Sequence, residues 1–146
     1  MGRIIAIDYG LKRTGIAVTD ICQLIANPLK TIKTHELMEF LTDYIKQETI
    51  DCIVVGEAKT LQNKASQSSL FIEPFVKNLQ KKFSTIPVER IDERFTSTIA
   101  LQTIRNMGLT KKRRQDKSLV DTVSATLILQ SYLELKNNNK QILLQK

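Results

Sequence analysis

The sequence of 146 residues has a single histidine, His35, and no tryptophan. One histidine excludes most zinc sites and Ser-His-Asp catalysis, which need several ligands or a histidine base beside a nucleophile. The two cysteines, Cys22 and Cys52, lie far apart and form no Cys-x-x-Cys motif, which excludes a disulfide framework. Any reaction must therefore depend on carboxylates, hydroxyls, lysines or arginines.

Long apolar runs are also missing: none approaches the roughly 20 residues that a membrane-spanning helix needs. No secretory signal peptide is recognisable. Since no disulfide framework is present either, we expect a cytoplasmic protein with no membrane partner.

Positive charge is in excess: 22 lysines and arginines outnumber 15 acidic residues, for a net charge of +7. This balance favours a polyanionic partner, most simply nucleic acid. Because aromatic residues make up only 5% of the chain, recognition by base stacking is expected to be weak.

The hydrophobic pattern begins with strands. The apolar run Ile4–Ile7 and the segment Gly15–Val18 read as two strands whose short connection predicts an antiparallel hairpin. A third strand is expected from Leu24 toward Lys33, interrupted near Pro28, which cannot donate a ladder hydrogen bond.

Strands and helices then alternate. Helical spacing of apolar residues predicts a helix over 35–47, with Thr34 as its N-cap. A buried strand over Ile50–Val55, a helix around residues 70–79 and a strand over Pro87–Ile91 follow. This order predicts parallel pairing through right-handed crossovers.

The C-terminal part is predicted to be helical. One helix is expected after Thr96 or Ser97, ending at Gly108, and a last one over Ser118–Leu135. The apolar face predicted for the last helix comprises Val120, Val123, Leu127 and Ile128. Without repeats or a linker, we expect one α/β domain over residues 1–136, followed by a polar, frayed tail over 137–146.

Acidic residues fall at the ends of these elements. Asp8 follows the first strand, Asp92 and Glu93 follow another, and Asp121 lies near the start of the last helix. An acid directly after a buried strand lies at the carboxyl edge of the sheet, where open α/β folds place their sites. Carboxylates gathered there repel one another, so a shared divalent cation, Mg²⁺ or Mn²⁺, would hold them ionised.

Each acid also has a purely structural interpretation. Asp8 could form a turn, Asp121 could be a favourable charge in a first helical turn, and Glu93 could pair with Arg94 or Arg90. It is the combination of the three acids with the excess of positive charge that favours a functional site over these structural roles.

Three motifs follow one another along the chain: Ile7–Ala17 (IDYGLKRTGIA), Asp92–Ser97 (DERFTS), and Val120-Asp121 leading to Ile128–Leu133 (ILQSYL). In this order they resemble the YqgF (RuvX) family of the RNase H-like superfamily. The resemblance runs from Ile4 to about Leu135. Members of this family are described as pre-16S rRNA nucleases and, earlier, as Holliday junction resolvases.

The resemblance implies an RNase H-like α/β fold: a five-stranded mixed sheet, its first three strands antiparallel, flanked by helices. It also implies that Asp8, Glu93 and Asp121 are the catalytic and metal-binding acids. Asp92 ranks second, because adjacent residues of a strand point to opposite faces. The implied reaction is hydrolysis of a phosphodiester bond assisted by two metal ions.

Basic residues lie close to these acids in the sequence. Lys12 and Arg13 follow Asp8, and Arg94 follows Glu93. We expect them to contact substrate phosphates, with surface ion pairs as the alternative. The segment Thr110–Lys117 precedes the helix that carries Asp121 and is either a guide for a phosphate backbone or a solvated loop. Its basic run is Lys111, Lys112, Arg113 and Arg114.

Three functions are compatible with these observations. The first is a nuclease that processes structured RNA, namely the 5′ end of pre-16S rRNA in ribosome biogenesis. The second is a Holliday junction resolvase that cuts branched DNA, which requires a dimer with paired sites. The third is an inactive nucleic-acid-binding module. The sequence leaves monomer and homodimer open.

Overall fold

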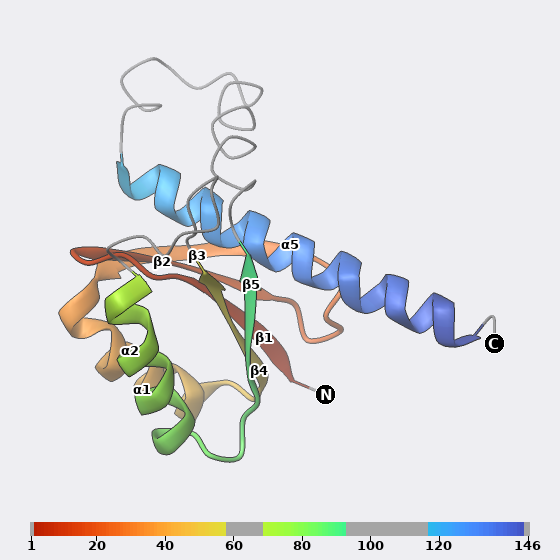
Figure 1. Ribbon diagram of the computed structural model, residues 1–146, viewed down its shortest axis with the longest axis horizontal. Helices are drawn as coiled ribbons and strands as arrows, with labels where there is room; N and C mark the ends of the chain where they lie inside the picture. Colours follow the sequence, from red (N-terminus) through yellow and green to blue (C-terminus); the bar gives the residue numbers. More distant parts are fainter. Residues whose placement is uncertain (1, 58–68, 93–116, 145–146) are drawn as a thin grey trace.

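The computed structural model describes residues 2–57, 69–92 and 117–144. Its centre is a five-stranded mixed sheet with strand order β3-β2-β1-β4-β5, with helices on both faces (Figure 1). The predicted α/β fold class is confirmed. The strands are β1 (Arg3–Asp8), β2 (Arg13–Thr19), β3 (Ala26–Lys33), β4 (Ile50–Glu57) and β5 (Val88–Asp92). The helices are the 3-10 helix η1 (Thr34–Glu36), α1 (Leu37–Gln47), α2 (Ser69–Lys82) and α5 (Lys117–Leu144).

The first three strands form an antiparallel meander, as predicted, and β1 to β2 is a hairpin. The predicted interruption at Pro28 occurs within β3, where the β2–β3 register shifts between Ile16 and Ala17. Pro28 is tolerated because β3 is an edge strand and its ladder with β2 is already irregular at this point.

The last two strands run parallel to β1. Strand β4 pairs with β1, and β5 pairs with β4. Helix α1 lies between β3 and β4 in the chain, and α2 lies between β4 and β5. The predicted crossover order is therefore confirmed, and it places the carboxyl ends of β1, β4 and β5 at one edge of the sheet.

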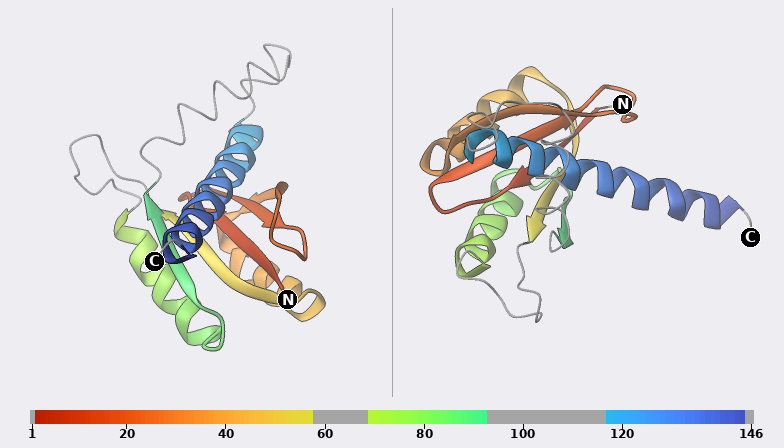
Figure 2. Two further views of the ribbon diagram at one scale, coloured as in Figure 1. Left: turned by 90° about the vertical axis from the view of Figure 1, so that its right-hand side faces the viewer. Right: turned by 90° about the horizontal axis from the view of Figure 1, so that it is seen from above.

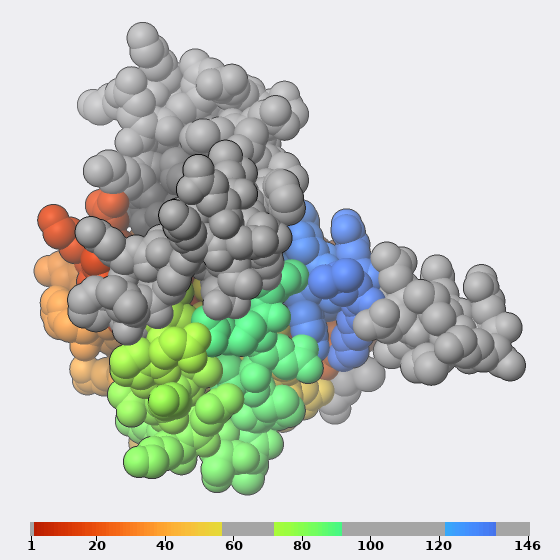
Figure 3. Space-filling view, viewed as in Figure 1, coloured from red at the N-terminus to blue at the C-terminus, as the bar shows by residue number. Residues whose placement is uncertain are grey.

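Helices α1 and α2 cover one face of the sheet (Figure 2). The buried residues of these helices recur every three or four positions, and they pack on Ile5, Ile7 and Ile53 of the strands. On the helices, the buried residues are Leu37, Leu41, Ile72, Phe75, Val76 and Leu79. In Figure 3 the surface of α2 lies beside β5, and an ion pair of 2.7 Å joins Glu73 of α2 to Arg90 of β5.

The predicted N-cap at Thr34 is wrong. Residues Thr34–Glu36 form the 3-10 helix η1, and the N-cap of α1 is Glu36, with no side-chain capping bond. The hydroxyl of Thr34 instead bonds to the backbone of Gly10. Pairing of β2 with β3 brings this distant carbonyl within reach, which no local pattern could indicate.

Helix α5 covers the other face of the sheet and crosses several strands (Figure 1). The predicted apolar face is only partly correct. Ile128 is buried, but Val123 and Leu127 are half-buried, and the side chain of Val120 lies outside the described residues. Among the side chains of this helix that the structure describes, the buried ones are Ser124, Ala125, Ile128, Leu129 and Leu133. Both sets have helical spacing, so contact with the sheet decides which is buried.

Helix α5 also continues to Leu144, through most of the segment that we expected to be a frayed tail. No glycine or proline follows Leu135, and extending an existing helix is far easier than nucleating one. None of the helices in the described ranges is both long and apolar enough to cross a membrane.

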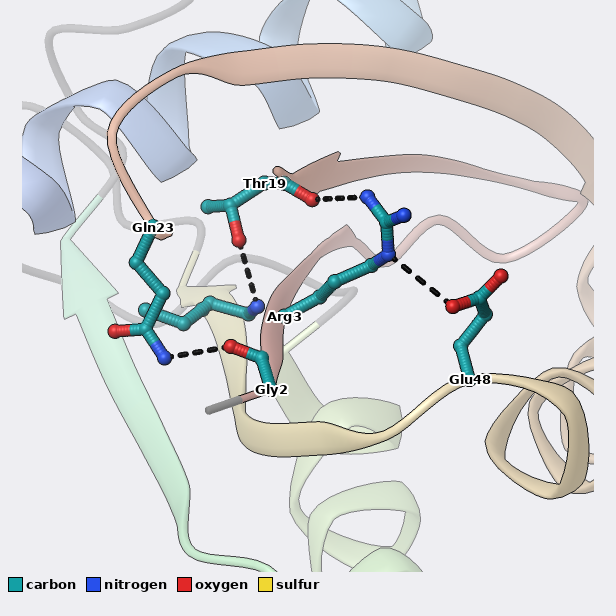
Figure 4. A network of polar contacts seen from close by, with 6 residues as sticks. Gly2, Arg3, Thr19, Gln23 and Glu48 are labelled. Atoms are coloured by element: carbon teal, nitrogen blue, oxygen red, sulfur yellow. Dashed lines mark hydrogen bonds and ion pairs between the residues drawn. The ribbon is translucent and has the colours of Figure 1, made fainter. Parts of the chain in front are cut away.

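The end of the sheet where the chain begins is held by polar contacts (Figure 4). Arg3 bonds to the carbonyl of Thr19 and forms an ion pair of 3.3 Å with Glu48. The Gln23 side chain donates to the carbonyl of Gly2 at 2.7 Å and accepts from Lys136 of α5 at 3.0 Å. These contacts stabilise the edge of the sheet opposite Asp8.

Candidate active site at the carboxyl edge of the sheet

Asp8 ends β1 on the face that α5 covers. Along β1, Ile5 and Ile7 pack with α1 and α2, whereas Ile4 and Ala6 pack with α5. Because side chains alternate along a strand, Asp8 belongs to the series of Ile4 and Ala6. The side chain is partly exposed, so its carboxylate lies at the rim of the core rather than within it.

The sheet register places one residue of β2 and one of β3 in line with Asp8. Asp8 pairs with Gly15 of β2, and Gly15 pairs with Thr31 of β3, so the three residues form one row on the same face. Next to Asp8 the row contains a glycine, so no side chain of β2 competes for the space beside the carboxylate.

Helix α5 is hydrogen-bonded to this row through the residue that follows Asp121. The hydroxyls of Thr31 and Thr122 are hydrogen-bonded, and Thr122 follows Asp121 in the chain. The hydroxyl of Thr126 in turn bonds to the carbonyl of Thr122 at 2.9 Å. The backbone of Asp121 therefore lies above the row that contains Asp8, while its side chain lies outside the described part of the structure.

Strand β5 ends at Asp92, which pairs with Glu57 at the same edge. Within β5, Ile91 packs on the α5 face, whereas Val88 packs on the α1 and α2 face. Glu93 follows the strand and lies outside the described residues, so the preference for Glu93 over Asp92 remains a prediction from strand alternation.

Lys12 and Arg13 lie exposed at the β1–β2 turn and the start of β2, close in the chain to Asp8. Alternation in β2 places Arg13 on the same face as Gly15, and thus as Asp8. The other predicted phosphate contacts, Arg94, Lys111, Lys112, Arg113 and Arg114, lie outside the described residues, as does the helix predicted between Thr96 and Gly108.

Sequence reasoning missed a residue that organises this turn. Thr34 bonds through its backbone and its side chain to residues on both sides of the turn. Nothing in the sequence around Thr34 indicates this role, because the contact depends on the pairing of β2 with β3.

The chemistry of the donors suits a divalent cation. Asp8 offers carboxylate oxygens, the ligands that Mg²⁺ and Mn²⁺ prefer, at a partly exposed position. Among the side chains described by the structure, no three or more of His, Cys, Asp and Glu gather closely enough to hold a metal ion. Glu93 and the side chain of Asp121 lie outside this described set.

Comparison with known protein families shows to which family this chain belongs. Residues 2–135 match the family model described as "RuvX: Holliday junction resolvase". The chain belongs to the RuvX family. The family resemblance identified from the three sequence motifs is thus confirmed.

Curated members of the RuvX family are similar over nearly the whole chain. A protein of Bacteroides fragilis is 56% identical over 136 residues, which cover 93% of this chain and 99% of the relative. A protein of Bacteroides thetaiotaomicron is 55% identical, with the same coverage of 93% and 99%. Both are named "Putative pre-16S rRNA nuclease".

Solved structures show the same fold at low sequence identity. RuvC of T. thermophilus in complex with a Holliday junction substrate has a TM-score of 0.56 at 16% identity, covering 93% of this chain and 97% of RuvC. The Fowlpox virus resolvase, in complex with Holliday junction DNA, has a TM-score of 0.53 at 14% identity, covering 90% and 97%. This RuvX-family chain therefore has the predicted RNase H-like fold.

Proposed function

We propose that this chain is a nuclease that hydrolyses phosphodiester bonds at the 5′ end of pre-16S rRNA, with Mg²⁺ or Mn²⁺ as its cofactor. The observation that carries the proposal is the row Asp8–Gly15–Thr31, to which α5 is bonded at the residue after Asp121. An RNA-processing role of this kind would place the protein in the cytoplasm.

The proposed metal ligands are Asp8, Glu93 and Asp121. Carboxylates that converge on one edge repel each other, and a divalent cation between them offsets that repulsion. A divalent cation held by these acids would supply positive charge that polarises the phosphodiester and makes water a better nucleophile. The chain's own contribution is to hold the carboxylates at fixed positions, Asp8 on a central strand and Asp121 on a helix bonded to the sheet.

The proposed phosphate contacts are Lys12 and Arg13 on the described part of the chain. Their positive charge lies close to Asp8, so a nucleic-acid backbone held by them would pass beside the carboxylate. We propose the same role for Arg94 and for the run Lys111, Lys112, Arg113 and Arg114, on the basis of their sequence positions.

One observation favours RNA as the substrate, and a second favours recognition of the nucleic acid through its backbone. The relatives named for pre-16S rRNA are 55–56% identical to this chain, whereas the resolvases match at 14–16% identity. In addition, the ring of Tyr9, next to Asp8, is stacked on Phe75 of α2 with centroids 4.6 Å apart. One face of this ring is therefore occupied, which favours backbone contacts over base stacking.

The deciding experiment compares cleavage of a precursor-rRNA fragment with cleavage of a four-way DNA junction, both in Mn²⁺. We expect wild type to cut the RNA and Asp8→Asn to lower the rate by more than about 100-fold, because it removes a charged ligand. Asp43→Asn is the matched control, because Asp43 is exposed on α1, which packs against the opposite face. Equal cleavage by Asp8→Asn and wild type would contradict the proposed site.

A Holliday junction resolvase is the second candidate, favoured by the printed description of the family model and by both solved structures. Symmetric cleavage of a junction needs two sites in one dimer. Junction cleavage together with a dimer in light scattering would therefore replace the RNA proposal. If neither substrate is cut, Mn²⁺ titration distinguishes the third candidate, since an inactive binding module would bind Mn²⁺ equally with and without Asp8→Asn.

A further inference from the structure

The β1–β2 turn, residues 9–12, is hydrogen-bonded to Thr34, the first residue of η1, which directly follows β3. The backbone N–H of Thr34 donates to the carbonyl of Lys12 at 3.0 Å. The hydroxyl of Thr34 donates to the carbonyl of Gly10 at 2.6 Å. Thr34 thus contacts the turn on both sides of its exposed tip, Leu11.

The hydroxyls of Thr14 and Thr34 form a chain with a definite direction. They lie 3.0 Å apart, and either could donate on geometry alone. Since a carbonyl can only accept, the single hydroxyl proton of Thr34 is used on Gly10, and Thr14 must be the donor to Thr34. Thr14 is fully buried, so loss of the Thr34 oxygen removes the acceptor of a buried hydroxyl.

The turn itself has little freedom to rearrange. A Cβ on Gly10 would lie 2.4 Å from the carbonyl oxygen of Arg13, so the chain folds back tightly at this point. On the other side, Tyr9 is stacked on Phe75. The turn is therefore fixed at both ends, and Lys12 and Arg13 are both exposed residues.

We propose that Thr34 is a positioning residue for nucleic-acid binding: it holds the β1–β2 turn so that Lys12 and Arg13 engage two phosphates beside Asp8. Long basic side chains are mobile, so the protein controls them mainly through the backbone that carries them. A turn fixed in advance loses less entropy when it binds. This inference rests on the proposed function, because it assigns the turn to the same substrate.

The test measures binding of the precursor-rRNA fragment with Ca²⁺ in place of Mn²⁺, over a series of salt concentrations. Thr34→Val is expected to weaken binding by about 3- to 10-fold, the range of one or two lost hydrogen bonds. The slope of log affinity against log salt should fall by up to roughly 0.7–0.9 for each phosphate contact that is lost. Thr34→Ser, which keeps the hydroxyl, should restore both quantities.

Thr42→Val is the matched control. The hydroxyl of Thr42 donates to the carbonyl of Met38 at 2.7 Å within α1, so the same substitution removes an equivalent bond away from the turn. Its affinity and salt slope should equal those of wild type. If Thr34→Val does not fold, the double variant Thr14→Val/Thr34→Val takes its place, because it leaves no buried hydroxyl without an acceptor.

The outcomes separate this inference from the proposed function. If Thr34→Val and Thr42→Val bind equally, or if wild type does not bind the RNA, the positioning role is overturned. Wild type that binds RNA but cuts neither substrate in Mn²⁺ contradicts the proposed nuclease. A weakened Thr34→Val in that case still supports the positioning role.

Discussion

At the scale of the residue, the role of a given side-chain type depends on which residues surround it in the folded chain. Thr34 has the chemistry of a helix cap and precedes a helix, yet its hydroxyl bonds to Gly10 across the sheet edge. Asp8 could be a turn former, yet strand alternation places it on the face that α5 covers. Residue type alone therefore does not determine which contacts a side chain makes.

The two cysteines provide a prediction at this scale. Cys52 is buried beneath α5, with its sulfur 3.8 Å from the hydroxyl of Tyr132, whereas Cys22 is exposed in the β2–β3 turn. Burial raises the pKa of the Cys52 thiol, so less thiolate is present at any given pH. We expect a thiol reagent at pH 8 to modify Cys52 more than about 10-fold more slowly than Cys22.

The control for this prediction is Cys22→Ser, which should leave only the slow phase. In denaturant, Cys52 of that variant should react as fast as a free thiol. A fast phase that persists in folded Cys22→Ser would show that Cys52 is accessible.

At the scale of the element, α5 shows where pattern reasoning is insufficient. Its sequence has apolar residues at helical spacing on more than one face, and the sheet buries the face of Ala125, Ile128 and Leu129. The existence of the helix was predictable from periodicity. Its rotation about its own axis was not, because the rotation depends on which side chains meet β1, β2 and β3.

Two leucines of α5 test this rotation. Leu133 is 7% exposed and Leu135 is 55% exposed, so the same substitution should have different effects. Leu133→Ala is expected to lower the free energy of unfolding by about 2–5 kcal/mol through loss of packing. Leu135→Ala should remain within about 0.5 kcal/mol of wild type. Urea unfolding of both variants provides the measurement, and equal losses would contradict the assigned face.

At the scale of the whole molecule, topology assembles the candidate site. Asp8, Gly15, Thr31 and Thr122 come from three strands and a helix, and they meet through sheet register and one side-chain bond. The same topology places the start of the chain against α5 at the far end, through Gln23 and Lys136. Helix α5 thus makes contacts at both ends of the strands, near Asp8 and near the start of the chain.

The proposed domain boundary at residue 136 gives a prediction at this scale. Leu133 is the last buried residue among the described side chains of α5, and Lys136 makes its bond to Gln23. Truncation after Lys136 should therefore lower the melting temperature by less than about 4 °C. Truncation after Gln130, which removes Leu133, is the comparison and should destabilise the fold strongly. Thermal melts of both proteins, followed by circular dichroism, decide whether residues 1–136 suffice.

The class of the protein can be predicted from its amino-acid sequence, through the alternating strands and helices, the antiparallel start, the excess of positive charge and the motifs of the RuvX family. These features are local or compositional, so periodicity and residue chemistry are enough to detect them. Three other facts are visible only in the folded chain: which face of α5 is buried, that Asp8 lies in a row with Gly15 and Thr31, and that Thr34 holds the β1–β2 turn. Those facts depend on contacts between residues far apart in the chain, whose energies no local pattern contains.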